Sequence, residues 1–244
     1  MDLIAEIYRT GAVTDQSGRA IPVHSHIDEA EGKFLFQFIR DREGIARTLE
    51  VGCAYGLSSL HITKAIQGRS GAHHVIVDAF QSTDWSNIGI SNLRRAGISF
   101  FELREELSEL ALPRLLEDQP ESFDLVFIDG WHTFDHTLLD LFYANRLIRI
   151  GGYIIVDDCH FPSVAKAVDY LSNYPCYRIA ARSPLQVKPR FRGRLARALP
   201  RKLAGRILPR NFYDHYYARA MFPTMIALQK VAPDNRDWRW HVSF

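Results

Sequence analysis

Long hydrophobic runs are missing from this sequence. The longest, around residues 153–156, falls well short of the roughly 20 apolar residues that a helix needs to cross a bilayer, so no membrane-spanning segment is predicted. Residues 1–6 have neither a positive leader nor an apolar core, and a secretory signal is not expected. Cysteine is scarce: Cys53, Cys159 and Cys176 are an odd number without metal-ligand spacing, which favours a reducing compartment. We therefore expect a cytoplasmic protein.

Internal repeats and low-complexity tracts are also lacking. Apolar residues make up 47% of the chain and charged residues 24%, which excludes a disordered or fibrous protein. A length of 244 residues fits one globular domain. The net charge of +2 is unevenly distributed, because residues 181–219 hold eleven Lys and Arg against the single acid Asp214. The rest of the chain is therefore net acidic.

Short apolar runs alternate with amphipathic stretches along most of the chain. The runs are apolar at consecutive positions, as expected for parallel strands buried on both faces, and lie at residues 48–51, 74–77, 98–103, 125–128 and 153–156. Helical patterns follow or separate them, at residues 58–66, 86–96, 107–116, 137–148 and 163–171. Pro113 is expected to shorten the third of these helices. Two last strands are predicted at 177–181 and 224–229. This order predicts an α/β fold with a doubly wound, mostly parallel sheet.

Small residues lie where the first predicted strand turns into a helix. Gly52, Ala54 and Gly56 allow a ligand to approach the backbone, and the following helix offers unpaired N–H groups. Asp78 closes the second strand, where an acid can accept hydrogen bonds from both ribose hydroxyls of an adenosine cofactor. A dinucleotide site would need a third glycine where Leu57 stands, so the pattern favours a cofactor with an amino-acid tail and no phosphate. The alternative is an ordinary strand-to-helix turn followed by a solvent-exposed aspartate.

Three segments resemble motifs of the class I S-adenosylmethionine-dependent methyltransferases: residues 48–56, 123–132 and 151–158. The stretch from about Gly11 to Leu171 is similar to the bacterial branch that contains antibiotic-sugar O-methyltransferases. The resemblance implies a seven-stranded sheet whose last strand is antiparallel. It also implies that Asp78 binds the cofactor ribose, that Glu105 or Glu106 faces the adenine, and that the methionine part contacts Glu50, Gly52, Ala54 and Gly56. Ala54 departs from the family, in which many members carry glycine there.

Three carboxylates follow two strands that we expect to be neighbours. Asp129 ends the fourth strand, and Asp157 and Asp158 end the fifth, so they can converge on one cation if the chain turns after Asp157. Carboxylate oxygens favour Mg²⁺ over Zn²⁺. The arrangement resembles metal-dependent O-methyltransferases of the catechol and antibiotic-sugar types. Catechol-type enzymes often have Asn in place of Asp158. Alternatively, Asp129 caps a turn and backbone amides order only one of the other two carboxylates.

Several side chains near these acids are candidates for the chemistry. His132 is the first choice for general base and His160 the second, and for each the alternative is a hydrogen-bonded surface residue. His24 and His26 line the acceptor pocket or stay in solvent. Trp131 shelters the site or packs.

Residues 181–219, called the basic segment below, carry an apolar residue at every fourth position over part of their length, with basic residues between them. Pro and Gly interrupt this pattern and favour two short helices over one, within residues 190–210. The pattern has four interpretations: a solvated face, a lid or dimer element, a contact with an anionic membrane, and a contact with a polyanion. The single domain then divides into an N-terminal cap (1–46), a cofactor-binding core (47–181), a basic insertion (182–219), and a last strand and tail (220–244).

Taken together, these patterns predict a class I O-methyltransferase that uses Mg²⁺ and acts on a hydroxyl of a sugar or other small natural-product acceptor. The alternatives are an N-methyltransferase, a nicotinamide oxidoreductase, and a cofactor-binding regulator or membrane-docked protein without turnover. The expected partners are the small acceptor and a second copy of the chain, and no specific nucleic acid is expected.

Overall fold

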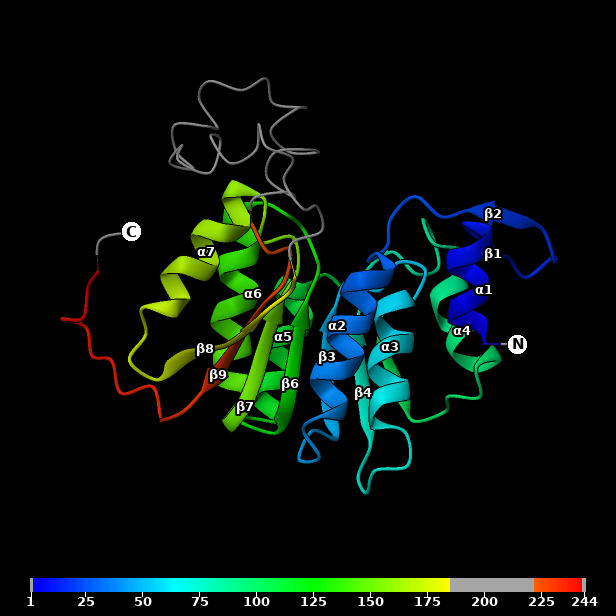
Figure 1. Ribbon diagram of the computed structural model, residues 1–244. Helices are drawn as coiled ribbons and strands as arrows, with labels where there is room; N and C mark the ends of the chain where they lie inside the picture. Colours follow the sequence, from blue (N-terminus) through cyan, green and yellow to red (C-terminus); the bar gives the residue numbers. More distant parts are fainter. Residues whose placement is uncertain (1, 185–221, 243–244) are drawn as a thin grey trace, which may run out of the picture.

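A computed structural model describes residues 2–184 and 222–242. Its main feature is a seven-stranded sheet in the order β5-β4-β3-β6-β7-β9-β8 (Figure 1). The strands are β3 (Arg47–Val51), β4 (His73–Val77), β5 (Phe101–Arg104), β6 (Phe123–Ile128), β7 (Ile148–Val156), β8 (Tyr177–Arg182) and β9 (Ile226–Lys230). β9 runs antiparallel to both β7 and β8, whereas the pairs from β5 across to β7 are parallel. The predicted α/β fold with an antiparallel last strand is therefore confirmed.

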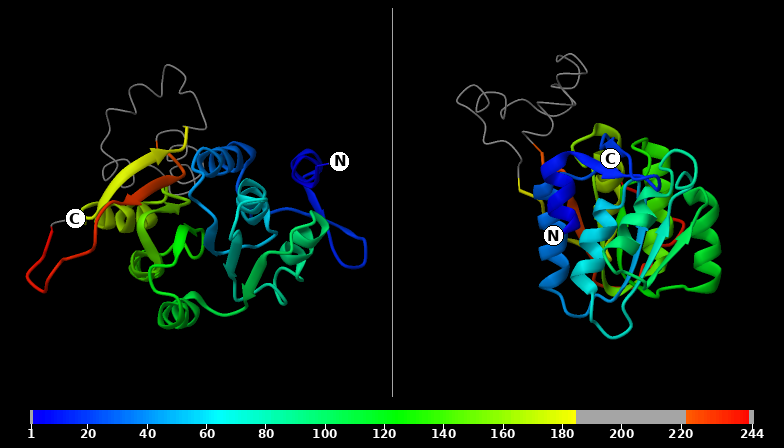
Figure 2. Two further views of the ribbon diagram at one scale, coloured as in Figure 1. Left: turned by 90° about the horizontal axis from the view of Figure 1, so that it is seen from below. Right: turned by 90° about the vertical axis from the view of Figure 1, so that its right-hand side faces the viewer.

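Helices cover both faces of the sheet, and each face has its own apolar core (Figure 2). One face packs against α2 (Glu29–Arg40), α3 (Leu57–Ile66) and α4 (Ile88–Arg95). The other face packs against α5 (Ser108–Asp118), α6 (Phe134–Leu147) and α7 (Pro162–Ser172). The central strands are buried on both faces, which explains why their sequences are apolar at consecutive positions.

The carboxyl ends of four neighbouring strands lie at one level. Val51 pairs with both Val77 and Ile128, and Ile128 pairs with Val156. The next residue of each strand is therefore placed along a single edge of the sheet: Gly52, Asp78, Asp129 and Asp157. The strand order also reverses between β3 and β6, and open α/β sheets bind ligands at such a point.

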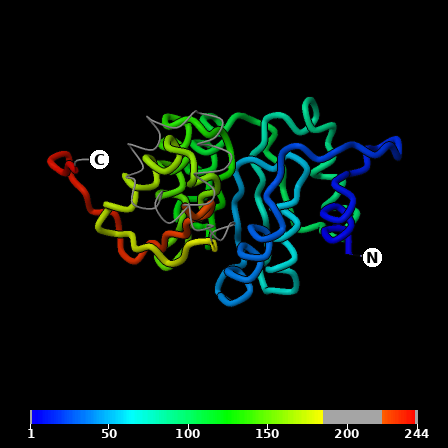
Figure 3. The backbone as a smooth tube through the Cα atoms, turned by 45° about the horizontal axis from the view of Figure 1, so that its top comes forward, coloured from blue at the N-terminus to red at the C-terminus, as the bar shows by residue number. Residues whose placement is uncertain are grey.

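The N-terminal region adds elements that the sequence patterns did not predict. Helix α1 (Leu3–Thr10) begins after Asp2, whose side chain accepts a hydrogen bond from the Ile4 amide. Residues 15–19 form the tip of a hairpin whose strands, β1 (Ala12–Thr14) and β2 (Ala20–Pro22), have three residues each. Strands this short leave almost no periodicity to detect. Helix α1 (blue) and residues 231–242 (red) lie at opposite ends of the molecule (Figure 3).

Several predicted element boundaries differ from the structure, and three of the differences have a local explanation. Helix α4 begins two residues late because Ser86 and Asn87 have positive φ angles of 50° and 56°, which no helix accommodates. Helix α5 continues through Pro113, although proline gives up one backbone hydrogen bond there. Strand β5 begins at Phe101, and Ile98 is instead a buried loop residue.

The basic segment falls almost entirely on residues 185–221, which lie outside the described residues. Its predicted helices, and its interpretations as a lid, a dimer element or a membrane contact, therefore stay predictions. Among the residues that are described, no helix is long and apolar enough to cross a membrane.

A close contact between α2 and α3 depends on Gly32. A Cβ atom at position 32 would overlap the imidazole of His61. His61 is buried on α3, lies 3.4 Å from the Tyr8 hydroxyl, and has a pKa that burial lowers to about 4. The neutral ring is therefore held between α1 and α2 and has little room to move.

We expect Gly32→Ala to destabilise the protein by about 1–3 kcal/mol, because overpacking outweighs the better helix propensity of alanine. For a chain of this size that corresponds to a fall in thermal midpoint of roughly 2–4 °C per kcal/mol, measurable by calorimetry. Gly44→Ala is the matched control, since its added methyl would meet only Arg149 at 3.8 Å. Equal midpoints for the two variants would contradict the packing argument.

Candidate active site

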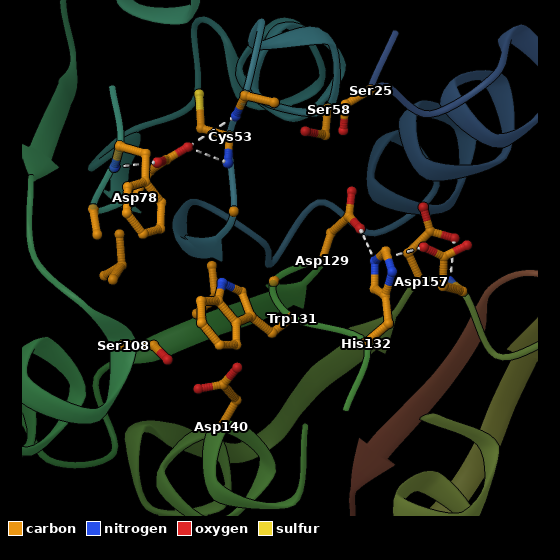
Figure 4. A pocket seen from close by; sticks show the side chains of 18 of the residues that line it. Ser25, Cys53, Ser58, Asp78, Ser108, Asp129, Trp131, His132, Asp140 and Asp157 are labelled. Carbon is orange, nitrogen blue, oxygen red and sulfur yellow. Dashed lines mark hydrogen bonds and ion pairs between the residues drawn. The ribbon is translucent and has the colours of Figure 1, made fainter. Parts of the chain in front are cut away.

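A cavity of about 430 Å³ opens at the edge where β3, β4, β6 and β7 end. Figure 4 shows the side chains that line it, with Asp78 on one side and Asp129, His132 and Asp157 on the other. Its walls come from the loops that follow these strands, from the segment before α2, and from the start of α5 and α6. The cavity thus lies where the strand order reverses.

The glycine turn forms the floor of this cavity. Gly52 has a φ of 85°, and a Cβ atom there would overlap the Asp129 carbonyl oxygen. Ala54 also has a positive φ, of 48°, and lines the cavity. Gly56 does not line the cavity; it precedes α3 with a φ of 81°, and a Cβ atom there would meet the Gly89 backbone at 2.9 Å. Gly56 is therefore needed for packing against α4.

Asp78 holds the glycine turn in shape. One carboxylate oxygen, Oδ2, accepts hydrogen bonds from the Cys53 amide (3.0 Å) and the Ala54 amide (2.9 Å). The side-chain amide of Gln81 donates to the same oxygen at 2.9 Å, and the Phe80 amide donates to Oδ1. Asp78 is only 7% exposed but lines the cavity. It couples the turn to β4, so the alternative of a solvent-exposed aspartate is wrong.

Glu50 lies outside the cavity. Its side chain is fully buried, accepts a hydrogen bond from the Ser59 hydroxyl, and lies 3.0 Å from His74 Nε2. Glu50 precedes the last residue of β3, and strand alternation turns its side chain toward α3. The structure therefore does not place Glu50 against the methionine part of a cofactor, as the motif resemblance implied.

Two of the three predicted metal ligands meet a histidine. Ligand atoms of Asp129, His132 and Asp158 all lie within 4.8 Å of one another. His132 Nε2 is 2.8 Å from Asp158 Oδ2 and 3.9 Å from Asp129 Oδ1. In this arrangement the imidazole lies between the two carboxylates, where it acts as their counter-ion.

The electrostatics show an excess of negative charge at this point. Burial raises the pKa of Asp129, and the nearby Asp158 carboxylate raises it further. Burial also raises the pKa of Asp157, with Asp129 as the next cause. Contacts with Asp129 and Asp158 raise the pKa of His132 to about 10. Three carboxylates against one imidazolium is a set of groups that a divalent cation fits.

The chain turns after Asp157, as we expected from the sequence. Asp158 has a φ of 53°, and its amide donates a hydrogen bond to Asp157 Oδ1 at 2.7 Å. Asp157 lines the cavity but lies outside the close group of Asp129, His132 and Asp158. The alternative from the sequence was that backbone amides order only one of Asp157 and Asp158. The hydrogen bond to Asp157 agrees with it, but Asp158 still approaches Asp129.

The remaining predicted candidates lie as follows. His160 is fully buried and does not line the cavity, and its Nδ1 is 3.5 Å from Asp158 Oδ1. Burial contradicts the alternative of a surface residue, and the role of a second general base stays a prediction. Glu106 lines the cavity, whereas Glu105 accepts a hydrogen bond from the Ser82 amide. Trp131 lines the cavity with 55% of its surface exposed.

The cavity is also lined by residues that the sequence left with two alternatives, and by others that it did not predict. His24 and His26 both line it, and His24 Nε2 is 2.8 Å from the Tyr55 hydroxyl. The rings of Tyr55 and Trp85 lie 5.1 Å apart, edge to face. Ser108 and Asp140 line the cavity beneath Trp131 and were not predicted (Figure 4). Asp140 lies in the middle of α6, where no sequence signal separates it from a surface acid.

Comparisons with known proteins agree with this geometry. Residues 49–159 match a family model described as a methyltransferase domain. Catechol O-methyltransferase B of Danio rerio is 31% identical over 136 residues, which cover 54% of this chain and 49% of that protein. The chain thus matches about half the length of this curated relative. Residues 49–159 are therefore similar to a methyltransferase domain.

Solved structures show that the chain shares its fold with known O-methyltransferases. An O-methyltransferase from Bacillus cereus in complex with SAH superposes with a TM-score of 0.64 at 17% identity, covering 94% of this chain and 91% of that one. TomG of Streptomyces achromogenes, an O-methyltransferase involved in tomaymycin synthesis and solved with SAM, gives 0.62 at 16% identity, with 95% and 91% covered. The predicted resemblance to S-adenosylmethionine-dependent O-methyltransferases is confirmed.

Proposed function

We propose that the chain is an S-adenosylmethionine-dependent O-methyltransferase that methylates a hydroxyl of a sugar or other small natural product, with Mg²⁺ bound beside it. The observation that carries the proposal is the joining, in one cavity, of the loop held by Asp78 and the cluster of Asp129, His132 and Asp158. A cofactor that binds along the loop brings its reactive end close to the cluster. The named O-methyltransferases among the similar proteins support the reaction type.

The cluster supplies the groups that an acceptor hydroxyl needs. Asp129 and Asp158 would hold the cation, with Asp157 close enough to contribute negative charge. When bound, Mg²⁺ stabilises the deprotonated form of an acceptor hydroxyl. Methylation of a hydroxyl releases one proton, and His132, which lines the cavity beside both acids, is placed to accept it. Neutralisation of the two carboxylates lowers the pKa of His132 toward the range in which an imidazole accepts a proton.

The rim supports a small polar acceptor. His24 and Trp85 line the cavity next to the loop. The buried Tyr55 packs edge to face against both rings, and its hydroxyl lies 2.8 Å from His24 Nε2. Flat apolar rings with polar edges suit a sugar or a phenolic ring. The relative named as a catechol O-methyltransferase favours a hydroxyl over an amine as the nucleophile.

The test is a pair of measurements on the purified chain. Titration calorimetry with S-adenosylhomocysteine is expected to show binding to one site, with or without Mg²⁺. Transfer of labelled methyl from S-adenosylmethionine is then measured across catechols, sugars and matched amines, with Mg²⁺ and with excess chelator. We expect hydroxyl acceptors to be methylated and chelator to stop the reaction. Absence of S-adenosylhomocysteine binding would refute the proposal, and transfer to amines alone would favour an N-methyltransferase.

A further inference from the structure

Asp140 is a buried carboxylate at the bottom of the cavity. It is 2% exposed, lines the cavity from α6, and lies beneath Trp131 next to Ser108 (Figure 4). Among the described residues, its Oδ1 atom is buried without a hydrogen-bond partner. Buried polar atoms are nearly always paired, so an unpaired carboxylate oxygen on a cavity wall indicates a partner that the chain itself does not supply.

Neighbouring groups compensate Asp140 only in part. Burial raises its pKa to about 6, opposed by a hydrogen bond from Ser108 and by the charge of His136. An ionised carboxylate left in this position above pH 7 costs free energy unless a donor meets it. Glu109 also lines the cavity, and its negative charge raises the pKa of Asp140 further. This end of the cavity therefore favours a ligand with N–H donors and disfavours a phosphate.

The shape of this end favours a flat ring. Trp131 and Leu107 both line the cavity, and the two residues are 55% and 38% exposed. Asp78 and the glycine turn lie on the adjoining side, where the proposed cofactor carries its ribose. The base attached to that ribose would lie against Trp131, with Asp140 below one of its edges.

We propose that Asp140 Oδ1 accepts a hydrogen bond from the exocyclic amino group of the cofactor's adenine. This inference rests on the proposed function and adds to it the residue that distinguishes a 6-amino purine from a 6-oxo purine. In a 6-oxo purine the exocyclic group is an acceptor, which a carboxylate repels.

The test compares two ligands that differ at this one group, S-adenosylhomocysteine and S-inosylhomocysteine, by calorimetry at pH 8. The wild type is expected to bind the adenosyl compound roughly tenfold to a hundredfold more tightly, as for one hydrogen bond to a charged group. Asp140→Asn should weaken S-adenosylhomocysteine binding and bring the two affinities close together. The ratio within each variant is insensitive to a general loss of stability.

Asp135→Asn is the matched control, because Asp135 lies on the same helix with its side chain 81% exposed. It should keep the wild-type ratio. Equal binding of both ligands by the wild type overturns the inference without any variant, and so does an unchanged ratio in Asp140→Asn. In both cases S-adenosylhomocysteine still binds and the proposed function stands. Binding of neither ligand by the wild type refutes both.

Discussion

Replacing Asp129 or Asp158 by asparagine is expected to lower methyl transfer by about a thousandfold while leaving S-adenosylhomocysteine affinity within a factor of a few. Asparagine keeps the shape of each side chain but removes the charge that the proposed cation needs. Both carboxylates belong to the close group with His132. The cofactor loop is held separately by Asp78. The measurement is the turnover number at saturating Mg²⁺ beside calorimetric binding of S-adenosylhomocysteine.

A surface acid provides the comparison for these two variants. Asp169→Asn removes the same charge from an exposed position on α7 and should keep wild-type turnover. In the wild type, excess chelator should reduce turnover to about the level of the two site variants. Full wild-type activity in chelator would remove the metal from the proposed function and leave the cofactor site unaffected.

Gly52→Val is expected to abolish detectable cofactor binding. The backbone at Gly52 has a φ of 85°, which a β-branched residue adopts only with strain. The added Cβ atom would also overlap the Asp129 carbonyl, so relief requires either the loop or the end of β6 to move. Either movement disturbs the amides of Cys53 and Ala54 that Asp78 holds. We expect affinity for S-adenosylhomocysteine to fall by more than about a hundredfold, together with a lower thermal midpoint.

Gly71→Val separates strain from contact in this prediction. Gly71 has a similar φ of 73°, but an added Cβ atom there would meet nothing within 4 Å. It should lower the thermal midpoint through backbone strain and leave cofactor affinity unchanged. If Gly52→Val and Gly71→Val bound S-adenosylhomocysteine equally well, the placement of the loop at the cofactor site would be wrong.

The sequence predicts the sheet well because burial on both faces leaves a clear pattern. The runs at 48–51, 74–77 and 125–128 match β3, β4 and β6 within two residues, and the turn at Gly52 follows from them. Elements that depend on few residues or on unusual backbone angles escape this reasoning. The three-residue strands of the hairpin and the late start of α4 are of this kind.

Side-chain direction limits what the sequence predicts about the site. Asp129 and Asp158 approach each other as their strand positions suggest. Glu50 and His160 follow the same motifs, yet both are buried away from the cavity because of neighbours that only the folded chain supplies. Asp140 reaches the cavity from the middle of α6, where its position depends on how that helix lies against the sheet. Such residues become visible only with tertiary structure.

Under the proposed function, the level ends of β3, β4, β6 and β7 form the part of the cavity that stays the same when the acceptor changes. Backbone bonds fix these ends, such as those from the Asp129 amide to Val51 and from the Asp157 amide to Ile128, and they do not depend on side-chain identity. The exposed segment of His24, Ser25 and His26 belongs instead to a short connection between β2 and α2. Substitutions in that connection can reshape the entrance for a different substrate without shifting the strand ends beneath it.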